Sequence, residues 1–122
     1  MHFSTNLTYL DLSANKLSRD SALILSGIIN KIKVLDLSHN RIQSEGAANL
    51  ASSVTQPGEG GLRVLGLTNA DIDDDGICAL LKAYEHPQSK LETILLWGNR
   101  VSFSKLRQKN AFFSTISISD HI

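Results

Sequence analysis

An eight-residue phrase occurs twice in this chain and constrains its architecture more than any other feature. Leu-Asp-Leu-Ser-Ala-Asn-Lys-Leu at 10–17 returns 25 residues later as Leu-Asp-Leu-Ser-His-Asn-Arg-Ile at 35–42. Two further copies follow, and all four fit the spacing L-x-x-L-x-L-x-x-N-x-L, with Ala70 in place of one Asn. The copies start 25, 30 and 29 residues apart, at Leu7, Ile32, Leu62 and Leu91. Such intervals predict a stack of similar structural units.

Each unit predicts a strand, a turn and a helix. The x-L-x-L part alternates with period two, which indicates a short strand with one buried face. Apolar residues at helical spacing follow in the first three units: Ala22, Leu25 and Ile29; Ala47, Leu50, Ala51 and Val54; Ile77, Leu80, Leu81 and Tyr84. Gly46 and Gly76 stand near the expected helix starts, where Ser44 and the acidic run 73–75 predict caps.

The Asn of each phrase has a structural purpose. Its side chain can hydrogen-bond the buried backbone groups of a sharp turn, and stacked copies can form a ladder. Ala70 interrupts that ladder, so we expect the turn of the third unit to be the weakest.

With these positions in register, the chain is similar to the leucine-rich repeat proteins over about residues 7–118. The unit length and the glycine near each helix start resemble the ribonuclease-inhibitor-like class, which includes tropomodulin and the Ran GTPase-activating proteins. The resemblance implies an α/β leucine-rich repeat solenoid, a right-handed superhelix with a parallel concave sheet and convex helices. We predict one domain over 1–122, with repeats near 7–31, 32–61, 62–90 and 91–112 and a short helix near 103–110. A degenerate carboxy-terminal strand and cap are predicted over 113–122.

Composition limits the partners and the location. Twelve basic and twelve acidic residues cancel, so no global charge favours nucleic acid or a membrane surface, and we expect neither as a partner. The single cysteine, Cys78, favours a reducing compartment, and the first ten residues do not resemble a secretory signal. We therefore predict a cytoplasmic protein, with delivery into a host cell, as for some bacterial effectors, left open.

Two acidic groups invite a chemical interpretation. The stretch 71–76, Asp-Ile-Asp-Asp-Asp-Gly, matches half of a calcium-binding loop, but Lys82 stands where the bidentate Glu belongs. We interpret this stretch as a helix-capping turn. Asp11 and Asp36 are expected on neighbouring strands about 5 Å apart, where they could share a proton or hold a cation. We interpret them as solvated surface residues, and predict no catalytic residue, no metal site and no cofactor.

The outward face of the strands is the predicted binding site for a protein partner of unknown identity. Its candidate residues are Tyr9, Asp11, Val34, Asp36, His39, Arg63, Leu95 and Trp97. Leu96 aligns with core leucines, so alternation turns Leu95 and Trp97 outward. Exposed aromatic residues are the usual anchors of interfaces. The alternative for Trp97 is an end cap packed on Phe112 or Ile116.

Two further functions remain open. Leu23, Ile24 and Ile28 make the first helix apolar nearly all round, and few residues precede the first strand. An uncovered end of a solenoid exposes apolar core and a free strand edge, which favour association. The sequence therefore predicts self-association, or a structural fragment of a longer solenoid. A GTPase-activating fragment is the less favoured alternative, because it rests on likeness of fold alone.

Overall fold

The computed structural model describes residues 9–57 and 61–100, in which strands and helices alternate. The strands are β1 (Tyr9–Asp11), β2 (Val34–Asp36), β3 (Val64–Gly66) and β4 (Thr93–Leu95). The helices are α1 (Arg19–Leu25), α2 (Gln43–Val54) and α3 (Asp74–Glu85), with a 3-10 turn η1 (Ile29–Lys31) after α1. The predicted helix near 103–110 and the cap over 113–122 lie outside the described residues.

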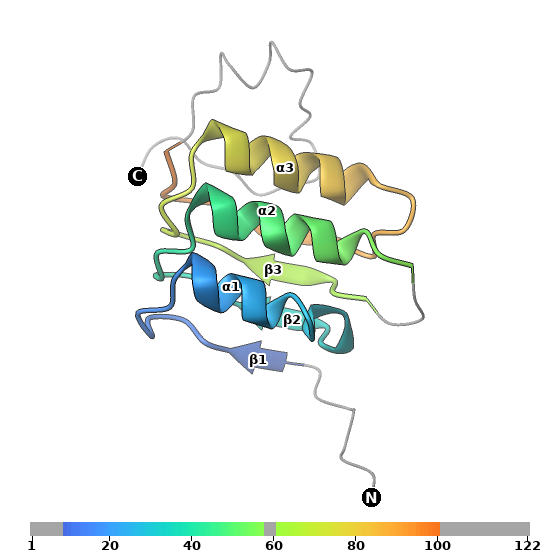
Figure 1. The fold of residues 1–122 in the computed structure, drawn as a ribbon, viewed down its shortest axis with the longest axis horizontal. Coiled ribbons are helices and arrows are strands. Elements are labelled where there is room, and N and C mark those ends of the chain that lie inside the picture. Colours follow the sequence, from blue (N-terminus) through green and yellow to red (C-terminus); the bar gives the residue numbers. More distant parts are fainter. Residues whose placement is uncertain (1–8, 58–60, 101–122) are drawn as a thin grey trace, which may run out of the picture.

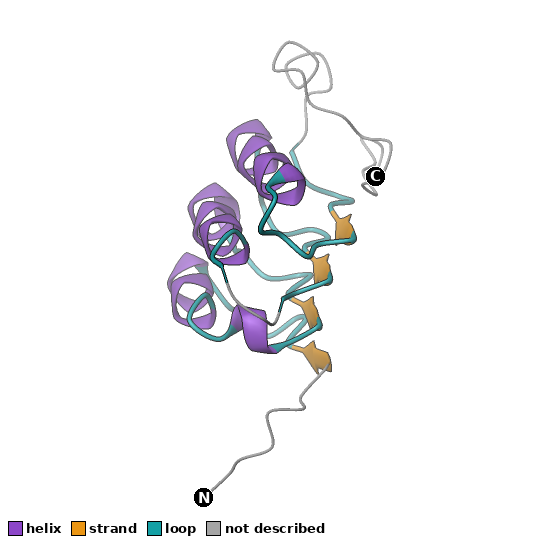
Figure 2. Ribbon diagram, turned by 90° about the vertical axis from the view of Figure 1, so that its right-hand side faces the viewer, coloured by secondary structure: helices purple, strands orange, loops and turns teal. Residues whose placement is uncertain are grey.

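The four strands form one parallel sheet in the order β1-β2-β3-β4, and the helices stack together along one face of that sheet (Figures 1 and 2). Leu10, Leu35, Leu65 and Ile94 lie opposite one another, as the repeat register predicts. A helix is about 10 Å wide, whereas neighbouring strands lie about 4.8 Å apart. The helical side of the stack is therefore longer, and the strands line the concave face. The predicted α/β leucine-rich repeat solenoid is confirmed.

The core lies between the sheet and the helices. It is built from the apolar positions of the repeat and from the predicted inner faces of the helices, including Leu35, Leu65 and Ile94 from the strands and Leu50 and Leu80 from the helices. Burying an aliphatic side chain of this kind contributes about 1.5–3 kcal/mol. Since each repeat supplies one layer, the core grows by stacking and no layer is complete alone.

The helix starts are less regular than the sequence predicts. Asp73 is the N-cap of α3, and its carboxylate accepts hydrogen bonds from the N–H groups of Asp75 and Gly76. In contrast, the prediction that Ser44 caps α2 is wrong. Ser44 lies inside α2, the N-cap residue Ile42 makes no side-chain cap bond, and the Ser44 hydroxyl bonds Asp73 of the next repeat. Ser44 therefore links two repeats at their helix starts.

The Asn ladder exists, and it runs backward along the stack. Asn99 Oδ1 accepts from the N–H groups of Ala70 and Ile72, in the preceding turn, at 3.0 Å each. Its Nδ2 donates to the carbonyls of Leu67 and Leu96. Asn99 thus satisfies backbone groups in the turn of the repeat before it.

Asn40 serves the first turn in the same way. Its Oδ1 accepts from the N–H groups of Asn15 at 2.9 Å and Leu17 at 2.8 Å. The direction of the ladder corrects the expectation that Ala70 weakens the third turn. The gap falls in the second turn, where within the described residues no hydrogen bond reaches the N–H of Asn40 or Ile42.

The second turn also has a different backbone. In the first and third turns the residue after the Asn position is left-handed, with φ of 58° at Lys16 and 59° at Asp71. In the second turn Arg41, after the Asn position, is not left-handed. Gln43 is left-handed instead, with φ of 65°, and its N–H donates to the carbonyl of Ala70. The equivalent residues Ser18 and Asp73 are N-caps in extended conformation. The missing Asn therefore accompanies a shifted turn and an uncapped α2.

Candidate protein-binding surface

Alternate residues of the four strands lie on the concave side of the sheet. Tyr9, Val34, Val64 and Thr93 lie opposite one another in one row, and Asp11, Asp36, Gly66 and Leu95 in the next. Leu95 is 36% exposed, and Trp97, beyond the end of β4, is 53% exposed. These two side chains give the concave surface an apolar end at β4.

The opposite end of this surface is acidic. The hydroxyl of Ser13 donates to Asp11 at 2.6 Å and lowers the pKa of that carboxyl, and the Ser13 N–H acts in the same direction. Asp36 accepts from the Ser38 N–H and lies over Gly66, where an added Cβ would come 2.6 Å from its Oδ1. The absence of a side chain at Gly66 therefore gives Asp36 its place between β2 and β3.

The remaining predicted residues surround these two ends. Tyr9 is 56% exposed on β1, and Val34 is half-buried beside it. Arg63 precedes β3 and pairs with Glu92 at 3.1 Å. His39 lies in the second turn, with its Nδ1 3.3 Å from the amide nitrogen of Asn69. The structure thus arranges the strand residues on one face, while Arg63 and His39 lie on opposite edges of it.

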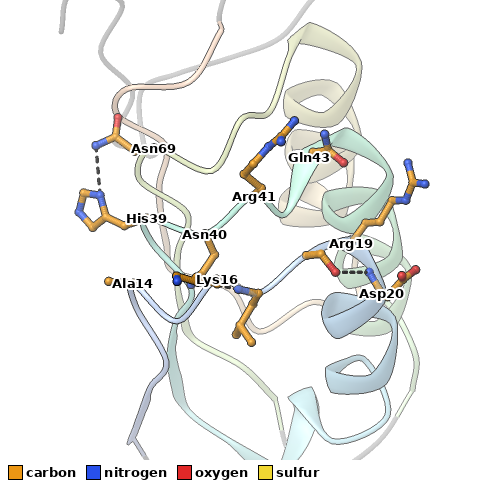
Figure 3. A pocket seen from close by; sticks show the side chains of 11 residues that line it. Ala14, Lys16, Arg19, Asp20, His39, Asn40, Arg41, Gln43 and Asn69 are labelled. Carbon is orange, nitrogen blue, oxygen red and sulfur yellow. Dashed lines mark hydrogen bonds between the residues drawn. The ribbon is translucent and has the colours of Figure 1, made fainter.

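A cavity of about 880 Å³ lies along the strand-to-helix turns, at the edge of the concave surface (Figure 3). Its lining includes Lys16, Arg19, Asp20, His39 and Arg41. Of the predicted site residues only His39 lines it, so this cavity and the exposed Leu95 and Trp97 are separate features. The sequence held one signal for it: two basic residues, Lys16 and Arg41, directly follow the Asn of their repeats.

The acidic stretch 71–76 is organised by neighbouring repeats. Asp71 lies between Arg100, at 3.0 Å, and Arg41, at 3.5 Å. The Gln43 amide lowers the pKa of Asp71 most, and the two guanidinium groups act in the same direction. The Ser44 hydroxyl lowers the pKa of Asp73, the cap of α3, together with the N–H groups at the start of the helix. These carboxylates therefore stabilise the junctions between repeats.

The described part of the chain offers no cluster of three His, Cys, Asp or Glu side chains that could hold a metal ion. Cys78 is a half-buried free thiol on α3. None of the helices within 9–57 and 61–100 has the length and apolar content required to cross a membrane.

Phe112 and Ile116, the predicted neighbours of Trp97 in the end-cap alternative, lie outside the described residues. About half of the surface of Trp97 is exposed and accessible to a partner.

Comparisons with known proteins agree with the repeat register. Models of the leucine-rich repeat match residues 6–28 and 29–51. A search of curated proteins returns no match. Among solved structures, the chain is similar to leiomodin-1 actin-binding site 2, with a TM-score of 0.70 and 12% sequence identity. That similarity covers 98% of this chain and 74% of the other, and at this identity it shows the fold alone.

Proposed function

We propose that this leucine-rich repeat protein is a non-catalytic binding module that holds a protein partner on its concave face. The observation that carries the proposal is the exposure of Leu95 and Trp97 on and beside β4. Exposure of two neighbouring large apolar side chains to water is unfavourable, whereas burial of such side chains supplies much of the binding free energy of protein interfaces. Leu95 lies on β4, and Trp97 lies in the turn after it, where its carbonyl accepts the N–H of Asn69 at 2.8 Å.

The partner is proposed to contact both ends of the concave surface. Its apolar part would cover Leu95 and Trp97, while Asp11 and Asp36 would face polar or basic groups. The proposed site also includes Tyr9, Val34, His39 and Arg63, which surround these residues. The solved neighbour is named for binding actin, so actin is a reasonable first probe for this chain.

The test compares three proteins in one capture experiment. Wild type should retain a specific protein, Trp97→Ala should lose it, and Ala48→Glu on the exposed side of α2 should keep it. An anchor of this kind should contribute about 2 kcal/mol or more to affinity, with little loss of folding stability. If Trp97 is instead an end cap, Trp97→Ala should cost about 3 kcal/mol of stability. Stability lost with binding intact would remove Trp97 from the site.

A second candidate function is assembly with like chains through the amino-terminal end, which the 77% exposure of Ile24 favours. We also propose the ribonuclease-inhibitor-like class, because α2 and α3 have 12 residues each and a glycine in the first turn. The single cysteine favours a cytoplasmic location, in the source cell or in a host cell. No described residue favours the GTPase-activating alternative.

A further inference from the structure

The amino-terminal end of the solenoid exposes apolar side chains beside an open sheet edge. Ile24 is 77% exposed and Ile28 43%, and Tyr9 on β1 is 56% exposed. Leu23, 59% exposed, borders them on the outer side of α1. Because β1 is the first strand in the sheet order, one of its edges has no strand partner among the described residues. Ile24 and Ile28 are called the end face below.

The register of the helices indicates that this end is not shaped for another repeat. A Cβ added at Gly46 would come 3.2 Å from the Cα of Arg19, on the preceding helix. One added at Gly76 would come 2.9 Å from the Cα of Ser44. Glycine therefore permits each helix to approach the one before it. The equivalent residue of α1 is Ser21, which has a Cβ at that position and whose hydroxyl accepts the N–H of Ser18 in the capping box of α1.

The next turn of α1 differs in the same way. Ile24 occupies the position that Asn49 has on α2 and Ala79 has on α3. Asn49 and Ala79 are both half-buried, and each lies three residues after the glycine that approaches the preceding helix. A preceding repeat at the regular spacing would therefore meet a serine side chain and a bulky isoleucine. The apolar end face requires a cover of another geometry.

We propose that the end face binds a second copy of this chain, with the two α1 helices antiparallel about a twofold axis. This arrangement brings identical apolar surfaces together and makes a closed, self-complementary interface. It also places unlike charges opposite each other. Asp20 lies in the first turn of α1, and Lys31 ends the short η1 turn that follows it. In an antiparallel pair, Asp20 of one copy faces Lys31 of the second copy.

The open edge of β1 supports the same arrangement. An unpaired strand edge is a template for pairing with another chain, and a twofold axis at this end brings the two β1 edges together. The interface continues both layers of the solenoid, sheet and helices. The proposal rests on assembly, the second proposed function, and is independent of partner binding at Trp97.

The test measures self-association of the intact chain by sedimentation equilibrium up to about 1 mM. Wild type should dimerise, and Ile24→Glu should raise the dimer dissociation constant at least about ten-fold. Ala48→Glu, on the exposed side of α2, and Trp97→Ala should leave it unchanged. Circular dichroism checks that each variant is folded. A monomeric wild type would overturn assembly as a whole, and a dimer insensitive to Ile24→Glu would overturn this interface alone.

A charge exchange tests the antiparallel arrangement. Asp20→Lys should weaken the dimer because it places a lysine opposite Lys31 of the second copy. The double variant Asp20→Lys with Lys31→Asp should restore the dissociation constant to near the wild-type value. Failure of the second substitution to rescue the first contradicts the antiparallel pairing of α1.

Discussion

Replacement of Ala70 by asparagine should stabilise the chain, because the structure shows which backbone groups would gain a partner. By analogy with Asn40 and Asn99, the new Oδ1 would accept from the N–H groups of Asn40 and Ile42. The new Nδ2 would donate to the carbonyl of Leu37. Asn40 and Ile42 are buried, so water does not replace these bonds.

The expected gain follows from the number of bonds. Each new hydrogen bond contributes about 0.5–1.5 kcal/mol net, which gives about 1–3 kcal/mol for the two N–H groups. Part of this gain is offset for two reasons. Arg41 must adopt the left-handed conformation in place of Gln43, and the Asn side chain loses conformational entropy when it is ordered. We expect a net gain of about 1 kcal/mol, or about 4 °C in Tm.

Thermal unfolding of wild type, Ala70→Asn and Ala70→Leu provides the assay. Leucine adds a similar volume without hydrogen bonds and should destabilise by about 1–3 kcal/mol through overpacking. An equal loss of stability in both variants would refute the ladder argument, since volume alone would then decide the outcome. The companion variant Asn40→Ala should reproduce the natural gap in the first turn and cost about 2 kcal/mol.

Three further predictions follow from the junctions between repeats. The pKa of Asp73 is lowered in the folded state, chiefly by Ser44, so its contribution is complete above about pH 4 and is lost as pH falls through the lower folded value. Asp73→Asn keeps a capping oxygen without the charge, and urea unfolding at several acidic pH values should show a shallower loss of its stability than for wild type. Titration calorimetry with millimolar calcium should give no heat beyond dilution; micromolar binding abolished by Asp73→Ala would overturn the capping interpretation. Gly98→Ala should cost about 2 kcal/mol in the same urea assay, because φ is 74° there and a Cβ would overlap Asn69 Oδ1; unchanged stability would show that Asn69 moves freely aside.

Much of the fold could be predicted from the repeat alone. Leu35, Leu65 and Ile94 face the core because period-two alternation and a registered phrase leave them no other face. The same alternation predicted the outward positions of Leu95 and Trp97. The phrase marked the Asn positions, but the direction in which each Asn bonds depends on how neighbouring turns stack. For that reason the sequence predicted that Ala70 weakens the third turn, whereas the hydrogen bonds that are missing among the described residues are those of the second turn.

Other features depend on contacts that no local pattern records. Ser44 has the residue type of a helix cap, and its hydroxyl instead bonds Asp73, 29 residues away. The cavity along the strand-to-helix turns forms where several turns meet, and in the sequence only Lys16 and Arg41 indicate it. Partner binding by the concave residues depends on interaction energies, which the position of a residue in the repeat does not determine.

The backward direction of the Asn ladder makes the two ends of the stack of repeats unequal. Asn40 and Asn99 each supply hydrogen bonds to the turn before their own, so for these bonds a turn depends on the following repeat and not on the preceding one. Within the ladder, loss of a repeat from the amino-terminal side removes only the partners of an amide side chain; at Asn15 this amide is exposed and donates to the carbonyl of Ser13 in its own turn. Loss from the carboxy-terminal side strands the N–H groups of a buried turn. Leucine-rich repeats joined by this ladder should therefore tolerate deletion, duplication and splicing unequally at their two ends, and an added repeat is best supported when it arrives together with the Asn of the repeat that follows it.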